Sequence, residues 1–174
     1  MIARRRLLLA LPCIAGLPAL GGCGWEPLYA DPQTATANAD LCAIKVDRIA
    51  ERVGQMLEFG LRDSLNPARE ATPTLYHLRV TLQTALASRG IQSQGLGTRG
   101  EVQASANYQL FEIKGEKLLL NGSVSANDSF DIQANGYSTL VAEDDAKRRA
   151  VEEIRREIVA RLTLFMQNRA PTAS

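Results

Sequence analysis

Histidine, tryptophan and cysteine are scarce in this sequence, and their scarcity removes several classes of function. The chain has one histidine, one tryptophan and three cysteines among its 174 residues. The single histidine, His77, has no cysteine or carboxylate at ligand spacing along the chain, so sequence motifs offer neither a zinc site nor a Ser-His-Asp triad. No G-x-S-x-G nucleophile motif is present either. We therefore expect a protein that is not an enzyme and that binds no metal or cofactor.

An excess of charge of one sign is also lacking. The 20 basic side chains nearly balance the 19 acidic ones, which gives a formal net charge of +1. Domains that bind nucleic acid usually carry a marked basic excess. We therefore expect no nucleic-acid partner.

The first 23 residues have the pattern of a bacterial lipoprotein export signal. Three arginines at positions 4–6 precede an apolar run over 7–20, which is too short to span a bilayer comfortably. The run closes in Leu20-Gly21-Gly22-Cys23, which resembles a lipobox. In that pattern Cys23 is lipidated and becomes the new N-terminus, and several acyl chains, palmitate among them, give stable anchoring. The arginines also permit the twin-arginine route, so the sequence leaves the export route open.

Cleavage before Cys23 would leave 152 residues with 17 basic and 19 acidic side chains. That length suits one domain with one core. We predict a signal peptide over 1–22, a lipid-anchored tether over 23–40, a single domain over 41–169 and a flexible tail over 170–174. Cys42 is then the only free thiol, and its place at the start of an apolar stretch predicts a small buried residue without chemistry.

Hydrophobic periodicity predicts four strands and two helices. The predicted strands cover 42–49, 74–86, 102–110 and 118–126, and the predicted helices cover 51–66 and 140–167. The expected fold class is α/β, a two-layer sandwich with a four-stranded, mixed or mostly antiparallel sheet and two helices on one face, in the order β-α-β-β-β-α. Residues 87–100 contain four glycines without periodicity and are predicted to form a flexible loop.

The start of the last predicted helix is acidic. Glu143, Asp144 and Asp145 are expected to favour the positive end of the helix dipole. Two ion pairs are expected one turn apart, between Asp144 and Arg148 and between Asp145 and Arg149. These acids predict a helix start and no metal site.

Two helices on one face of a sheet leave the other face open. The three long predicted strands place eleven polar side chains on that face, of which only Arg79 is charged, whereas soluble surfaces normally mix charges of both signs. An uncharged polar face suits the hydrogen-bonding lumen of an outer-membrane β-barrel, where an unpaired charge would be costly. The alternative is a soluble surface that is low in charge by chance, and composition leaves both open. The candidate barrel-facing residues are Arg79, Gln83, Gln103, Asn107, Asn121 and Ser125.

The run Gly95-Leu96-Gly97-Thr98-Arg99-Gly100 matches the dinucleotide-binding pattern G-x-G-x-x-G. That fingerprint needs a helix after the glycines, and here an alternating strand follows, so we expect no nucleotide site. Arg89 and Arg99 in this region are candidates for contact with lipopolysaccharide phosphates or with a barrel, as are Lys114 and Lys117 at the turn between the last two strands.

Three short motifs resemble those of the lipopolysaccharide-assembly lipoprotein family, LptE, in an alphaproteobacterial form. They are Gly22-Cys23-Gly24-Trp25-Glu26-Pro27-Leu28-Tyr29, Arg52-Val53-Gly54-Gln55, and Asp145-Ala146 with Arg149-Ala150. The resemblance covers the mature chain in element order. It implies an outer-membrane lipoprotein of the periplasmic leaflet that plugs the LptD β-barrel, assists its assembly and takes part in lipopolysaccharide transport. The alternative is a periplasmic lipid-binding carrier or chaperone anchored to the outer membrane, which would need an apolar cavity.

Overall fold

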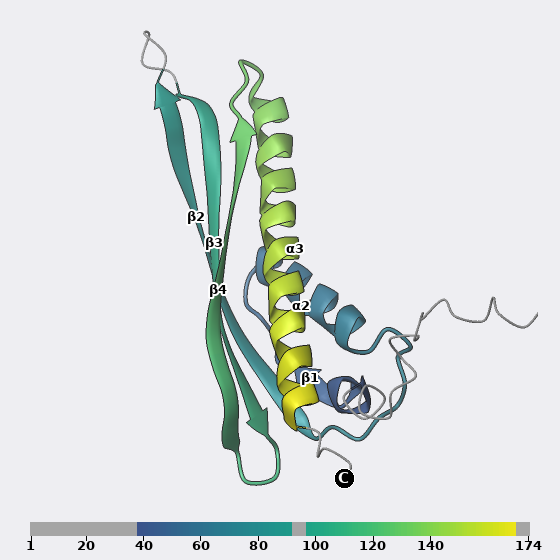
Figure 1. The fold of residues 1–174 in the computed structure, drawn as a ribbon. Helices are drawn as coiled ribbons and strands as arrows, with labels where there is room; N and C mark the ends of the chain where they lie inside the picture. Colours follow the sequence, from purple (N-terminus) through teal and green to yellow (C-terminus); the bar gives the residue numbers. More distant parts are fainter. Residues whose placement is uncertain (1–37, 92–96, 170–174) are drawn as a thin grey trace, which may run out of the picture.

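The predicted order of strands and helices is confirmed by a computed structural model, which describes residues 38–91 and 97–169 (Figure 1). The elements are β1 (Ile44–Val46), α2 (Arg52–Leu65), β2 (Tyr76–Ile91), β3 (Gly97–Glu112), β4 (Lys117–Asp131) and α3 (Gly136–Arg169). A short helical segment at 38–42 precedes β1. The predicted signal peptide, most of the tether and the tail lie outside the described residues.

The four strands form one mixed sheet in the order β1-β2-β3-β4, as expected. β1 is parallel to β2, and the three long strands pair antiparallel in sequence order. β1 pairs with only the first three residues of β2, from Tyr76 to Leu78. The rest of the sheet is therefore a long three-stranded meander.

Both long helices lie on one side of the sheet, which gives the predicted two layers (Figure 1). α3 runs along β3 and β4, and α2 packs against α3 and β1. The apolar stripe of each helix is buried, with Leu57 and Leu61 on α2 and Ile154 and Ile158 on α3 among the fully buried side chains. Burial of these stripes against the apolar side of the sheet makes the core.

The predicted flexible loop over 87–100 is wrong in most of its length. β2 continues to Ile91 and β3 begins at Gly97, with Arg89 opposite Arg99 in the register. The prediction is wrong because it took these glycines as turn residues, which is their usual role. Gly100 instead makes room for packing, since a Cβ at this position would collide with the Phe130 ring. The expected strand after the glycine pattern is confirmed.

The last helix begins earlier than predicted, at Gly136 instead of residue 140. The Asn135 side chain accepts a hydrogen bond from the backbone N–H of Tyr137 at 3.0 Å, which caps the helix start. The acids from Glu143 onward therefore lie beyond the first turn, and the expected dipole interaction is wrong.

The ion pairs around these acids also differ from the prediction. Asp145 pairs with Arg148, at 3.4 Å, and Arg149 reaches across to Asp128 on β4, at 2.6 Å. These ion pairs make the outer side of α3 charged. No helix in the described part of the chain is both long and apolar enough to cross a membrane.

Candidate functional site

The open face of the sheet carries the polar rows that the sequence predicts. The register aligns one residue from each long strand in a row: Arg79, Gln109 and Asn121; Thr81, Asn107 and Ser123; Gln83, Ser105 and Ser125; Ala85, Gln103 and Asn127. All six candidate barrel-facing residues are exposed to solvent. We call these four rows the polar face.

Charge is confined to one corner of the polar face. Arg79 is its only charged side chain, and the other positions carry amides, hydroxyls or the small Ala85. The opposite, helical side carries paired charges, such as Glu153 with Arg156 at 2.6 Å and Glu157 with Arg161 at 2.8 Å. Within these four rows the open side therefore carries much less charge than the helical side, whereas Glu101, Arg99 and Asp131 follow on the same open side farther along the strands.

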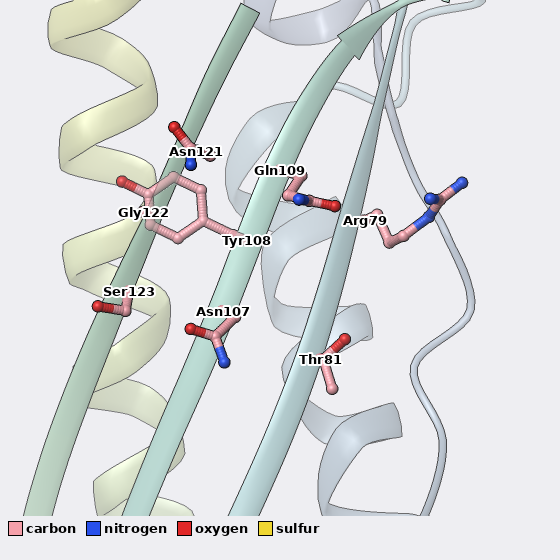
Figure 2. A pocket seen from close by; sticks show the side chains of 8 residues that line it. All are labelled: Arg79, Thr81, Asn107, Tyr108, Gln109, Asn121, Gly122 and Ser123. Atoms are coloured by element: carbon pink, nitrogen blue, oxygen red, sulfur yellow. The ribbon is translucent and has the colours of Figure 1, made fainter. Parts of the chain in front are cut away.

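A hollow of about 530 Å³ lies within the polar face (Figure 2). Tyr108 and Gly122 are among its lining residues, and the Tyr108 ring occupies the space that a side chain at position 122 would need. The remaining lining is polar, so the hollow can exchange hydrogen bonds with water or with another protein surface. Its lining residues are Arg79, Thr81, Asn107, Tyr108, Gln109, Asn121, Gly122 and Ser123.

A cluster of four side chains lies next to this hollow, and the sequence did not reveal it. His77 stacks on Phe111 with ring centroids 5.0 Å apart, and the Arg79 guanidinium carbon lies 5.2 Å from the centre of the Phe111 ring. Asp47 Oδ2 lies 3.3 Å from His77 Nδ1 and 3.9 Å from Arg79 Nε. His77 thus has a carboxylate partner, which arrives through the parallel pairing of β1 with β2 and which spacing along the chain could not show. The cluster holds Arg79 at the edge of the polar face.

Within residues 38–91 and 97–169, no group of three or more side chains could hold a metal ion. The thiol of Cys42 is partly buried, and this burial raises its pKa, with a smaller effect from Glu70. The reactive thiolate is therefore disfavoured, as expected for a packing residue. Cys23, the candidate lipidation site, lies outside the described residues.

The four candidate cations lie at opposite ends of the sheet. Arg89 and Arg99 are paired in the register near the ends of β2 and β3, where Arg99 donates a hydrogen bond to Ser129 Oγ at 2.8 Å. Lys114 and Lys117 lie at the exposed turn between β3 and β4. About 15 residues of extended strand separate Arg99 from Lys114, or about 40–50 Å at ~3.3 Å per residue. The two pairs therefore cannot bind one phosphate group together.

Comparison with known proteins finds the same fold in a protein that is designated a lipoprotein. No protein-family model and no curated protein matches the chain. A crystal structure of a protein from Caulobacter crescentus, designated a lipoprotein, superposes with a TM-score of 0.61 at 23% identity, over 76% of this chain and 97% of that one. The two chains share a fold.

Two further solved structures match less well. A minor lipoprotein from Acinetobacter baumannii matches with a TM-score of 0.49 at 15% identity, over 75% of this chain and 95% of that one. The rare lipoprotein B from Shewanella oneidensis matches with a TM-score of 0.46 at 11% identity, over 72% of this chain and 93% of that one. TM-scores below 0.5 do not establish a shared fold for either protein.

Proposed function

We propose that this chain is an outer-membrane lipoprotein, anchored through acylated Cys23 in the periplasmic leaflet, whose polar face seats inside a β-barrel of LptD type. In this role it assists barrel assembly and takes part in lipopolysaccharide transport to the cell surface. The observation that carries the proposal is the polar face itself: four aligned rows with one charged residue.

The physical argument rests on the cost of burying different polar groups. Amides and hydroxyls can exchange water for hydrogen bonds to a polar barrel wall at little net cost. An unpaired charge would lose its hydration without compensation. A face such as this one can therefore be buried against a polar lumen, and its only charge, Arg79, already has Asp47 as a neighbour.

The charges on the helical side of the domain are also consistent with a polar face that lies inside a barrel. Its charges form ion pairs with one another along α3, such as Glu153 with Arg156. These pairs remain satisfied in water, so this side does not require a partner. A lipid carrier, the alternative function, would need an apolar lining, whereas the hollow in the polar face is lined largely by amides, hydroxyls and Arg79.

Lipopolysaccharide contact is the second part of the proposal and concerns the end of the sheet that carries Arg89 and Arg99. Guanidinium groups bind phosphate through paired, charge-assisted hydrogen bonds, and lipid A carries phosphates. Replacement of both arginines by Glu is expected to weaken lipopolysaccharide binding in vitro. Unchanged binding would remove both residues from the site.

Affinity capture from outer membranes tests the barrel partnership. The tagged full-length protein is expected to bring down a β-barrel of LptD type, and its absence would refute the proposal. Ser105→Glu places a carboxylate at the middle of the polar face and is expected to abolish capture. Gln167→Glu adds the same charge at an exposed position on α3 and serves as the matched control.

Both variants must first show a wild-type circular dichroism spectrum and thermal midpoint. If the folded Ser105→Glu variant captures the barrel as well as Gln167→Glu does, the polar face does not contact the barrel. If both lose capture equally, the effect comes from charge alone and the assignment of the face is wrong.

A further inference from the structure

One end of the open sheet side is apolar, in contrast to the polar face next to it. Leu75, Ile113 and Leu118 remain 48%, 47% and 45% exposed, and Phe111 lies beside them, partly covered by the His77 ring. We call these four residues the apolar end. Exposed leucine and isoleucine side chains gathered at one place indicate a contact with an apolar partner.

The residues of the apolar end are held together by the strand register. The backbone N–H of Ile113 donates to the carbonyl of Leu75 at 3.0 Å. Phe111 lies opposite Leu118 in the pairing of β3 with β4. The four residues therefore lie in or directly next to the three long strands, at the end of the sheet that carries the turn between β3 and β4; this is the lower end in Figure 1.

The turn next to the apolar end carries two lysines. Lys114 and Lys117 are exposed, and neither forms an ion pair with any residue that the structure describes. Glu116 is the single acid of the turn, and Glu112, opposite Lys117 in the register, already pairs with Arg169 at 3.6 Å, so the two lysines leave an excess of positive charge. Apolar side chains flanked by lysines are typical of segments that lie in the interface of an anionic membrane, with the lysine ammonium groups at the headgroups.

The chain also enters the domain at this end. The backbone N–H of Leu75 donates to the carbonyl of Ala43 at 3.0 Å, so the first described residues lie beside the apolar end. The 14 residues 24–37 separate this region from Cys23. Whatever their conformation, these residues can span at most about 50 Å, at ~3.3–3.6 Å per residue. β3 alone has 16 residues, or about 50 Å at ~3.3 Å per residue. An anchor at Cys23 thus favours this end of the sheet over the opposite one.

We propose that the apolar end, with Lys114 and Lys117, docks on the phospholipid surface of the leaflet that holds the Cys23 anchor. The sheet then stands with the turn between β3 and β4 at the headgroups and with the Arg89 and Arg99 end away from them. This inference rests on the lipid anchor of the proposed function, and it does not depend on the barrel.

Fluorescence of an environment-sensitive label tests this orientation in the acylated full-length mature protein. The background variant is Cys42→Ala, and the label is attached to Ile113→Cys in vesicles of phosphatidylethanolamine and phosphatidylglycerol. We expect a blue-shifted emission, quenching by nitroxide-labelled lipids and protection from aqueous iodide. Leu140→Cys, at an exposed apolar position on the first turns of α3, is the matched control and is expected to show the reverse.

Several outcomes would overturn the proposal. Equal iodide quenching at both positions would place the apolar end in water. Protection of the Ile113 label from both quenchers would mean that the chain's own N-terminal segment covers this end. The label is also measured in a variant that carries both Lys114→Glu and Lys117→Glu. If its emission is still blue-shifted in vesicles that contain phosphatidylglycerol, the lysines do not contribute to membrane binding, and this part of the proposal is wrong. Barrel capture is measured separately, so loss of this inference leaves the proposed function standing.

Discussion

Tyr108 of β3 lies directly over Gly122 of β4, and the glycine is what makes room for the ring. The two residues are paired in the register, and Tyr108 is 2% exposed. A Cβ at position 122 would lie 2.6 Å from the tyrosine Oη. The reverse arrangement occurs farther along the same two strands, where Phe130 of β4 covers Gly100 of β3. Each pair fills a place on the helical side of the sheet with a ring from one strand.

Gly122→Ala is expected to destabilise the protein by about 1–3 kcal/mol, because a buried ring must move to accept the added methyl group. The free energy of unfolding is measured by urea denaturation. Ser123→Ala, at the neighbouring exposed position, is the control and should change it by less than about 0.5 kcal/mol. A Gly122→Ala variant as stable as this control would contradict the packing argument.

Gly60→Ala is expected to behave differently, although its Cβ would also lie close to a neighbour. That neighbour is Arg155 Cδ, at 2.7 Å, in the middle of a long side chain whose guanidinium binds Ser64 of α2 and Glu152 of α3. Alanine nevertheless favours the helical state over glycine by about 1 kcal/mol. We therefore expect a smaller loss of stability than for Gly122→Ala, or a gain, in the same urea measurement. A larger loss would show that Arg155 is fixed between the two helices.

Glu58 is the buried carboxylate of α2, and its replacement is expected to be costly. One oxygen accepts the backbone N–H of Ile49 at 3.0 Å, and the other lies 2.7 Å from Arg62 Nη2. Glu58→Ala would leave a buried N–H without its partner, a loss of about 1–3 kcal/mol in unfolding free energy. Glu153→Ala removes an exposed ion pair of α3 and is expected to cost less than about 1 kcal/mol.

The ion pair between Asp128 and Arg149 gives a pH-dependent prediction. The hydrogen bond from Arg149 lowers the pKa of Asp128, with a smaller opposing effect from burial. A carboxylate with a lowered folded-state pKa stabilises the fold above its ordinary pKa, and this contribution is lost as the pH falls through the folded-state value. Asp128→Asn should therefore be less stable than wild type at pH 7, and the difference should close as the pH falls below about 4.

The measurement is the thermal midpoint of both proteins across that pH range. Asp63→Asn, which breaks the exposed pair with Arg69, is the control and should change the midpoint little at any pH. A constant difference between Asp128→Asn and wild type at all pH values would mean that the ion pair is not its cause.

The cap of α3 can be tested at Asn135. Asn135→Ala removes the side-chain acceptor for the Tyr137 N–H and is expected to cost about 1 kcal/mol in unfolding free energy. Gln133→Ala changes a nearby exposed side chain without removing the cap. If both variants are equally stable, the helix start does not depend on Asn135.

The glycine-rich segment shows where sequence reasoning failed. Glycine predicts turns because it tolerates unusual backbone angles. At Gly100 it serves a different purpose, since the Phe130 ring occupies the space of a side chain. That ring is 30 positions away in the chain, so no local pattern could have revealed it. The same holds for Asp47 beside His77, which the parallel pairing of β1 with β2 brings together from 30 positions apart.

The sequence by itself determined the order of the elements and the composition of the two sheet sides. Alternation with period two is a local property, so the residue pattern alone places Gln103, Ser105 and Asn107 on one face. The tertiary structure alone decided the register that aligns them with Asn121 and Ser123 of β4, and which residues gather at each end of the sheet. Those relationships depend on how segments distant in the chain pair and pack, and hydrophobic periodicity carries no information about that pairing.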